Sequence, residues 1–139
     1  MTESDEQDER ISLIFGGKIP SVGEESLSLY LAYLKEHLEL PCELTGIEDF
    51  EWEEYYVLGP GDRKEYEGRK KTMPSYSDKY QLISLADEVD DWMGILVQVK
   101  RVSDKKKFTL PLSDMEATEE GSKNYQLLDD YSVWFVNNR

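Results

Sequence analysis

The chain has 139 residues and carries 16 lysine and arginine residues against 30 aspartate and glutamate residues, which gives a formal net charge of −14. This length fits one domain, and a hydrophobic share of 39% is enough to build one core. A polyanion of this kind is poorly suited to binding nucleic-acid phosphates, and it is better suited to binding cations or a basic protein partner.

Several other features narrow the class of protein. No stretch approaches the roughly 18 consecutive apolar residues of a membrane span, and the acidic N-terminus is unlike a secretory signal or a transit peptide. The single cysteine, Cys42, excludes an internal disulfide and a multi-cysteine zinc site. We therefore expect a cytoplasmic protein that binds neither membranes nor nucleic acid.

The N-terminal part divides into an arm and a helix. Residues 1–10 hold five carboxylates without apolar partners, so we expect a disordered acidic arm ahead of a single globular domain over residues 11–139. Residues 11–15 are a short apolar run, which favours a strand or an extended segment. Leucines at positions 27, 31, 34 and 38 share one helical face, and the capping-box spacing of Ser21 and Glu24 precedes them. This pattern predicts a helix over about 24–38.

A β-rich body is expected over about 41–137. Alternating or compact apolar runs predict strands at 42–45, 55–58, 80–85, 93–102, 108–112 and 131–136. Pro111 indicates that the fifth of these strands lies at a sheet edge or ends at this proline, and residues 124–130 are expected to form a short helical turn. The predicted fold class is α+β, mainly β, with an N-terminal amphipathic helix followed by a small rolled sheet or an SH3-like partial barrel.

The residues offer little for catalysis. His37 is the only histidine, and it lies five residues before the only cysteine, where a surface imidazole and a core thiol are the simpler interpretation. The sequence contains no nucleophile elbow, phosphate loop or dinucleotide fingerprint. We therefore expect a protein that is not an enzyme.

Oxygen ligands, in contrast, are concentrated in one segment. Residues 48–54 hold five carboxylates interleaved with Phe50 and Trp52. If residues 49–53 are extended, Asp49, Glu51 and Glu53 project from one face. Two such charges 4 Å apart repel by about 1 kcal/mol in water and about 4 kcal/mol near a protein surface, so a divalent cation would relieve the crowding. The segment does not follow the EF-hand pattern. These residues alone leave a cation site and a plain acidic surface both open.

Five motifs together resemble one family. They are FEWEEYYVLG at 50–59, PSYSD at 74–78, WMGIL at 92–96, FTLPL at 108–112 and NYQLLDDYSVW at 124–134. Their order is similar to that of the bacterial calcium-binding proteins typified by the cyanobacterial CcbP. The resemblance implies a small acidic cytosolic protein that binds Ca²⁺ through carboxylates without an EF-hand. In cyanobacteria such proteins regulate free calcium during cell differentiation, so a buffer or a sensor in signalling is expected.

The resemblance also implies a set of metal ligands. Six carboxylates are the candidates: Asp49, Glu51, Glu53, Glu54, Asp129 and Asp130. The resemblance carries over the first four of these. Asp129 or Asp130 would complete the shell if the final strand lies beside residues 48–54, and the alternative role of this pair is in a turn or a helix cap. The acids at 87–91 form either a second, weaker site or a loop between strands.

A rival hypothesis uses the same charge differently. An acidic interaction module would bind a basic partner or mimic nucleic-acid charge, and its carboxylates would line an extended surface instead of converging. Ten of the 16 bases fall at 63–71 and 100–107, where they pair with acids within the fold, pair across a dimer, or form a solvated face. The number of calcium sites and the oligomeric state stay open at this level.

Overall fold

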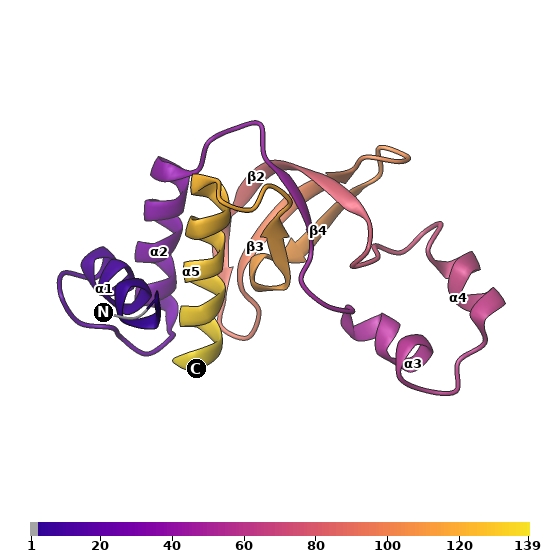
Figure 1. Cartoon of the computed structure of the whole chain (residues 1–139), viewed down its shortest axis with the longest axis horizontal. Helices are drawn as coiled ribbons and strands as arrows, with labels where there is room; N and C mark the ends of the chain where they lie inside the picture. Colours follow the sequence, from indigo (N-terminus) through magenta and orange to yellow (C-terminus); the bar gives the residue numbers. More distant parts are fainter. Residues whose placement is uncertain (1–2) are drawn as a thin grey trace.

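The computed structural model describes residues 3–139 and has an α+β architecture (Figure 1). The helices are α1 Glu3–Ile14, α2 Glu24–His37, α3 Glu54–Val57, α4 Arg63–Arg69 and α5 Lys123–Asn137. The strands are β1 Glu43–Gly46, β2 Lys79–Asp90, β3 Gly94–Arg101, β4 Lys107–Pro111 and β5 Met115–Ala117. Two 3-10 turns, η1 Glu51–Glu53 and η2 Leu112–Asp114, complete the described elements. Over this range, no helix is both long enough and apolar enough to cross a bilayer.

The strands form one open antiparallel sheet in the order β4-β3-β2-β1-β5. The predicted α+β class, with an amphipathic helix ahead of a sheet, is confirmed. The helix predicted over 24–38 is α2, and the strands predicted at 93–102 and 108–112 are β3 and β4, which form a hairpin with Val99 opposite Phe108. Strand β4 lies at the edge of the sheet and ends at Pro111, because proline has no N–H to continue the pairing.

The core lies between the sheet and the helices α2 and α5, with α1 on the far side of that pair (Figure 1). Tyr131 and Trp134 of α5 are fully buried there. Gly94 allows α5 to approach the start of β3, since a Cβ at this position would lie 2.5 Å from the Tyr131 hydroxyl oxygen. That hydroxyl accepts a hydrogen bond from the Ile95 N–H at 2.9 Å, which fixes the helix against the strand.

The N-terminal segment differs from the disordered acidic arm that was predicted. Residues 3–10 are helical, and the run at 11–15 contains the end of the same helix and not a strand. Ile11 is buried in the core, and Phe15 packs against Tyr30 and Trp134. These distant partners supply the burial that the acidic composition does not reveal. Residues 1–2 of the predicted arm lie outside the described residues.

Two predicted strands are also wrong. Residues 55–58 lie in α3 and its C-terminal cap, and residues 131–136 belong to α5. A short aromatic run suits either structure, so only its packing partners decide between them. In α5, Leu127, Tyr131 and Trp134 recur at helical spacing and all face the core. The acids at 87–91 lie mostly within β2 and not in a loop, and Asp87 forms an ion pair with Lys35 at 2.6 Å.

Candidate functional site

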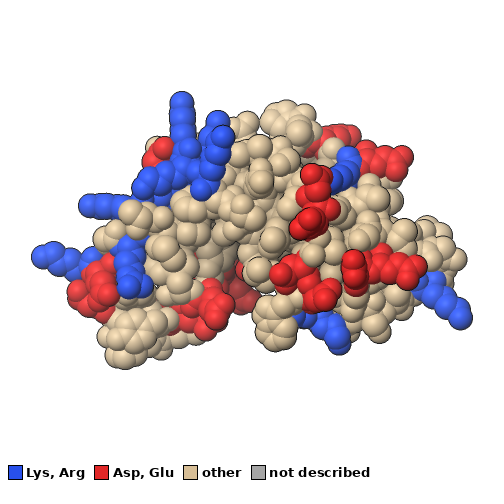
Figure 2. Space-filling model, turned by 180° about the vertical axis from the view of Figure 1, so that it is seen from behind, with Lys and Arg blue, Asp and Glu red and all other residues tan. Residues whose placement is uncertain are grey.

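A surface groove of about 730 Å³ brings together carboxylates from distant parts of the chain. One wall is the segment 47–54, and the facing walls are η2 and the C-terminal half of α5. Six carboxylates line it: Glu48, Asp49, Glu51, Glu54, Asp114 and Asp129. Ser113, Ser132 and Asn137 add further oxygen atoms. In Figure 2, acidic side chains gather around the hollowed lower middle of the molecule.

Backbone contacts after β1 hold the first wall in place. A Cβ at Gly46 would lie 2.6 Å from the Cα of Tyr76, so only glycine permits this close crossing of two backbone segments. The Gly46 N–H donates to the Tyr76 carbonyl at 2.9 Å, and the Ile47 N–H donates to the Asp114 carbonyl at 2.9 Å. These bonds place Glu48 opposite η2, although more than 60 residues separate them in sequence.

The groove carboxylates are close enough to influence one another. Loss of surrounding water raises the pKa of Asp114 above its ordinary value, and the negative charges of Glu48 and Glu51 add to the rise. Glu116 of β5 lies outside the groove, and its pKa is also raised, first by burial and then by the negative charges of Glu120 and Asp129. Each raised pKa means that the ionised form is disfavoured in the folded protein. A cation in the groove would reverse that effect.

Glu53, a candidate ligand, lies outside the groove. Its side chain is 0% exposed. Oε2 accepts from the Tyr66 hydroxyl at 2.6 Å and the Ser75 hydroxyl at 2.7 Å, and Oε1 accepts from the Tyr76 N–H at 2.8 Å and the Phe50 N–H at 3.2 Å. The extended conformation under which Asp49, Glu51 and Glu53 would share one face is not present, because residues 51–53 form a 3-10 turn, which directs Glu53 inward and away from Glu51. Its position makes it a structural anchor.

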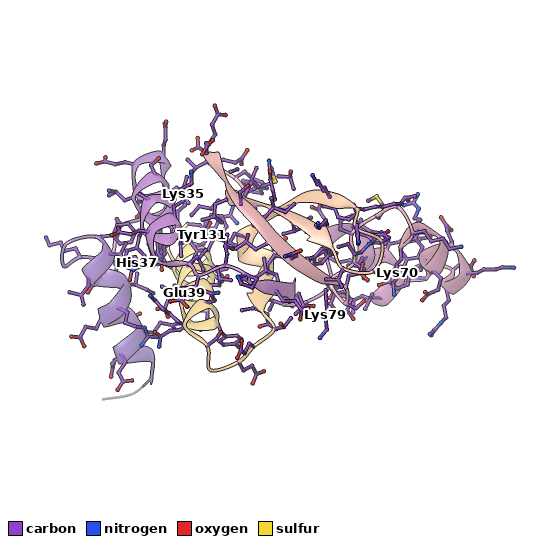
Figure 3. The ribbon with its side chains drawn as sticks, turned by 90° about the horizontal axis from the view of Figure 1, so that it is seen from above. Lys35, His37, Glu39, Lys70, Lys79 and Tyr131 are labelled. Atoms are coloured by element: carbon purple, nitrogen blue, oxygen red, sulfur yellow. The ribbon has the colours of Figure 1, made fainter. Side chains whose placement is uncertain are left out.

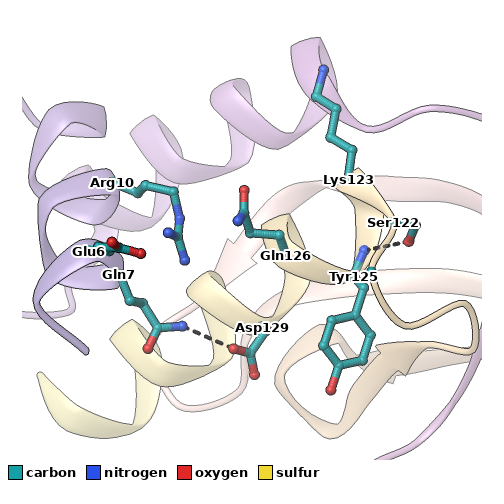
Figure 4. Close-up of a pocket in the computed structure, with 9 residues that line it drawn as sticks. Glu6, Gln7, Arg10, Ser122, Lys123, Tyr125, Gln126 and Asp129 are labelled. Carbon is teal, nitrogen blue, oxygen red and sulfur yellow. Dashed lines mark hydrogen bonds between the residues drawn. The ribbon is translucent and has the colours of Figure 1, made fainter. Parts of the chain in front are cut away.

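Asp130 is also separated from the groove. Adjacent residues on a helix point in different directions, so Asp129 lines both the groove and the neighbouring pocket beside α1, while Asp130 is buried under α1. Arg10 donates to both oxygens of Asp130 at 2.9 Å. Gln7 Nε2 bridges the pair, at 3.0 Å from Asp129 Oδ2 and 2.9 Å from Asp130 Oδ1; Figure 4 shows the bond to Asp129. Asp130 is therefore neutralised within the fold.

The structure thus sorts the six sequence candidates. Asp49, Glu51, Glu54 and Asp129 line one groove, whereas Glu53 and Asp130 do not. Asp114 was missed as a candidate ligand, and only the tertiary contact between the loop after β1 and η2 identifies it. Glu48 belonged to the recognised acidic cluster.

The donor set suits a hard cation. Calcium takes six to eight oxygen ligands in flexible geometry, and the groove offers carboxylate, hydroxyl and amide oxygens. Within residues 3–139, no three Asp, Glu, His or Cys side chains lie close enough to one another to hold a metal ion in the conformation observed. Ion binding would therefore require the exposed Glu51 and Glu54 side chains to move across the groove toward the carboxylates of the facing wall.

Comparison with known proteins identifies the class. Residues 61–135 match the model of the CcbP family, which is described as calcium binding. This match covers more than half of the chain, so the chain belongs to the CcbP family of calcium-binding proteins, which is not an enzyme family. The matched segment includes Asp114 and Asp129 but not the wall at 47–54.

Two solved structures share the fold. The crystal structure of Anabaena CcbP has a TM-score of 0.59 at 15% identity, and the similarity covers 99% of this chain and 94% of that one. A calcium-binding protein in its calcium-binding form has a TM-score of 0.55 at 19% identity, with coverage of 98% and 96%. No curated protein sequence matches the chain.

Proposed function

We propose that this protein is a cytoplasmic calcium buffer or sensor that binds Ca²⁺ in the groove between residues 47–54, η2 and α5. Six carboxylates line this groove, and none of its described lining residues carries a positive charge. That observation supports the proposal most directly. The family membership and the raised pKa of Asp114 agree with it.

The groove residues would act from opposite walls. Asp114 and Asp129 stand on η2 and α5, which are held by the core, and would form the fixed part of the shell. Glu51 and Glu54 are exposed on the other wall and would close over the ion. A site with such flexible arms favours calcium over magnesium, since magnesium requires a near-ideal octahedron. This design differs from the twelve-residue loop of an EF-hand.

The test is a calorimetric titration of chelator-treated protein with Ca²⁺ and, separately, with Mg²⁺. We expect calcium to bind at micromolar concentration and magnesium to bind far more weakly. Asp114→Asn should weaken calcium at least about tenfold, because it removes one full ligand charge. Glu88→Gln, which removes an exposed carboxylate of β2 that does not line the groove, is the matched control. Absence of calcium binding below millimolar concentration would contradict the proposal, and equal effects of both variants would place the site elsewhere.

A further inference from the structure

Two basic stretches that are distant in sequence form one cationic end of the molecule. Residues 62–71 and 100–107 together hold ten bases and four acids, a net charge of +6. The rest of the chain holds six bases and 26 acids, a net charge of −20. In Figure 2 a group of basic side chains projects from one end, and in Figure 3 Lys70 lies at the end opposite Lys35 and His37 of α2. The basic side chains of these two stretches are therefore concentrated at one end of an otherwise acidic protein.

Specific bonds hold the two stretches together. Arg101 at the end of β3 is 2% exposed, and its guanidinium donates to the carbonyls of Lys70 at 3.0 Å and Lys71 at 3.1 Å. The same group binds Asp104 at 2.7 Å, which fixes the hairpin turn. Lys106 Nζ also donates to the Lys71 carbonyl at 2.7 Å. Because these contacts join the segment after α4 to the β3–β4 hairpin, the cationic end is a built surface.

The tip of this hairpin is convex and unneutralised. It projects from the body at the end of β3 and β4 (Figure 1). Lys105 and Lys107 are exposed there, and within residues 3–139 neither forms a salt bridge. Val102 beside them is also exposed. The acidic groove has the opposite character, with a concave shape, six carboxylates and an exposed apolar residue, Val136.

We propose that the hairpin tip of one copy docks into the acidic groove of a second copy, so that Lys105 and Lys107 provide the positive charge that calcium otherwise supplies. The occupant is a second copy because a projecting basic tip and an acidic groove are both present on this chain. This inference rests on the proposed calcium function of the groove. Each copy carries one tip and one groove, so the contact is heterologous and leads to head-to-tail assembly.

Calcium and the second copy then compete for one groove. Exposed ion pairs are individually weak and are screened by salt, so the dissociation constant of the contact is on the order of 1 mM. Calcium should dissociate the assembly, and a rise in ionic strength should do the same. The −20 charge on the rest of the molecule makes a long polyanion such as nucleic acid a poorer occupant of the cationic end.

The experiment is sedimentation velocity of the full chain over a concentration series up to the millimolar range, in chelator and in calcium. The parent should show a rising apparent mass in chelator at low salt and remain monomeric in calcium. The double variant Lys105→Glu with Lys107→Glu should stay monomeric in both, whereas Lys18→Glu, an exposed charge outside the cationic end, should behave as the parent. Circular dichroism would verify that each variant is folded.

Three outcomes would overturn this inference. They are a monomer under all conditions, association that survives the hairpin double variant, and association that survives Asp114→Asn, which would place the occupied surface outside the groove. A calorimetric titration of the same samples separates the two proposals. Calcium binding without association contradicts only the docking, whereas no calcium binding contradicts the proposed function itself.

Discussion

Replacing Glu53 with glutamine tests whether this carboxylate is an anchor or a ligand. The change exchanges one acceptor oxygen for an NH₂ donor. Depending on the orientation of the amide, the donors that lose their acceptor are Tyr66 and Ser75, or Tyr76 and Phe50. A hydrogen bond to a charged group contributes about 1.5–3 kcal/mol, and removing the buried charge returns part of that. The expected loss in the free energy of unfolding is about 3 kcal/mol.

Urea unfolding in chelator measures this loss, and Glu51→Gln is the matched control. Glu51 is two residues away and exposed in the groove, so its variant should change stability by about 0.5 kcal/mol or less. The same Glu51 variant should weaken calcium binding in calorimetry. A Glu53→Gln protein as stable as the parent, with weaker calcium binding, would refute the reasoning and return Glu53 to the ligand shell.

Three other perturbations give distinct outcomes. Arg101→Lys should lower stability by about 3 kcal/mol in urea unfolding, because one ammonium cannot replace the guanidinium bonds to Asp104 and the segment after α4; an unchanged midpoint would contradict this. Gly94→Ala should lower the free energy of unfolding by about 3 kcal/mol, because the added Cβ meets the Tyr131 hydroxyl and the φ of residue 94 is +76°. The melting temperature should fall accordingly, and Gly68→Ala, where an added Cβ meets no other atom, is the control. The pKa of Asp114 is raised in the folded state. This group therefore contributes to stability when the pH is below its ordinary pKa, and that contribution is lost as the pH rises through the raised pKa. Calcium should therefore stabilise more as pH rises through that range and should release protons on binding, and calorimetry in buffers of different ionisation enthalpy should detect them; a proton count of zero would contradict the assignment.

The candidate site shows how far residue patterns reach. The acidic cluster at 48–54 was predictable because its charges are adjacent in sequence, and it does form one wall of the groove. The direction of each side chain was not, since an extended segment and a 3-10 turn place Glu53 on different sides. Asp130 could not be assigned either, because its partner Arg10 is 120 residues away.

The sequence by itself determined the elements whose pattern is local. The spacing of the leucines in α2 predicts a helix, and the alternation of apolar residues in β3 predicts a strand. The surplus of carboxylates follows from composition. Only the tertiary structure decided which carboxylates share a groove and which are neutralised. It also decided that residues 131–136 continue a helix, and that two basic stretches meet at Arg101. The physical reason is that burial and charge pairing depend on partners far along the chain, and a local pattern does not contain them.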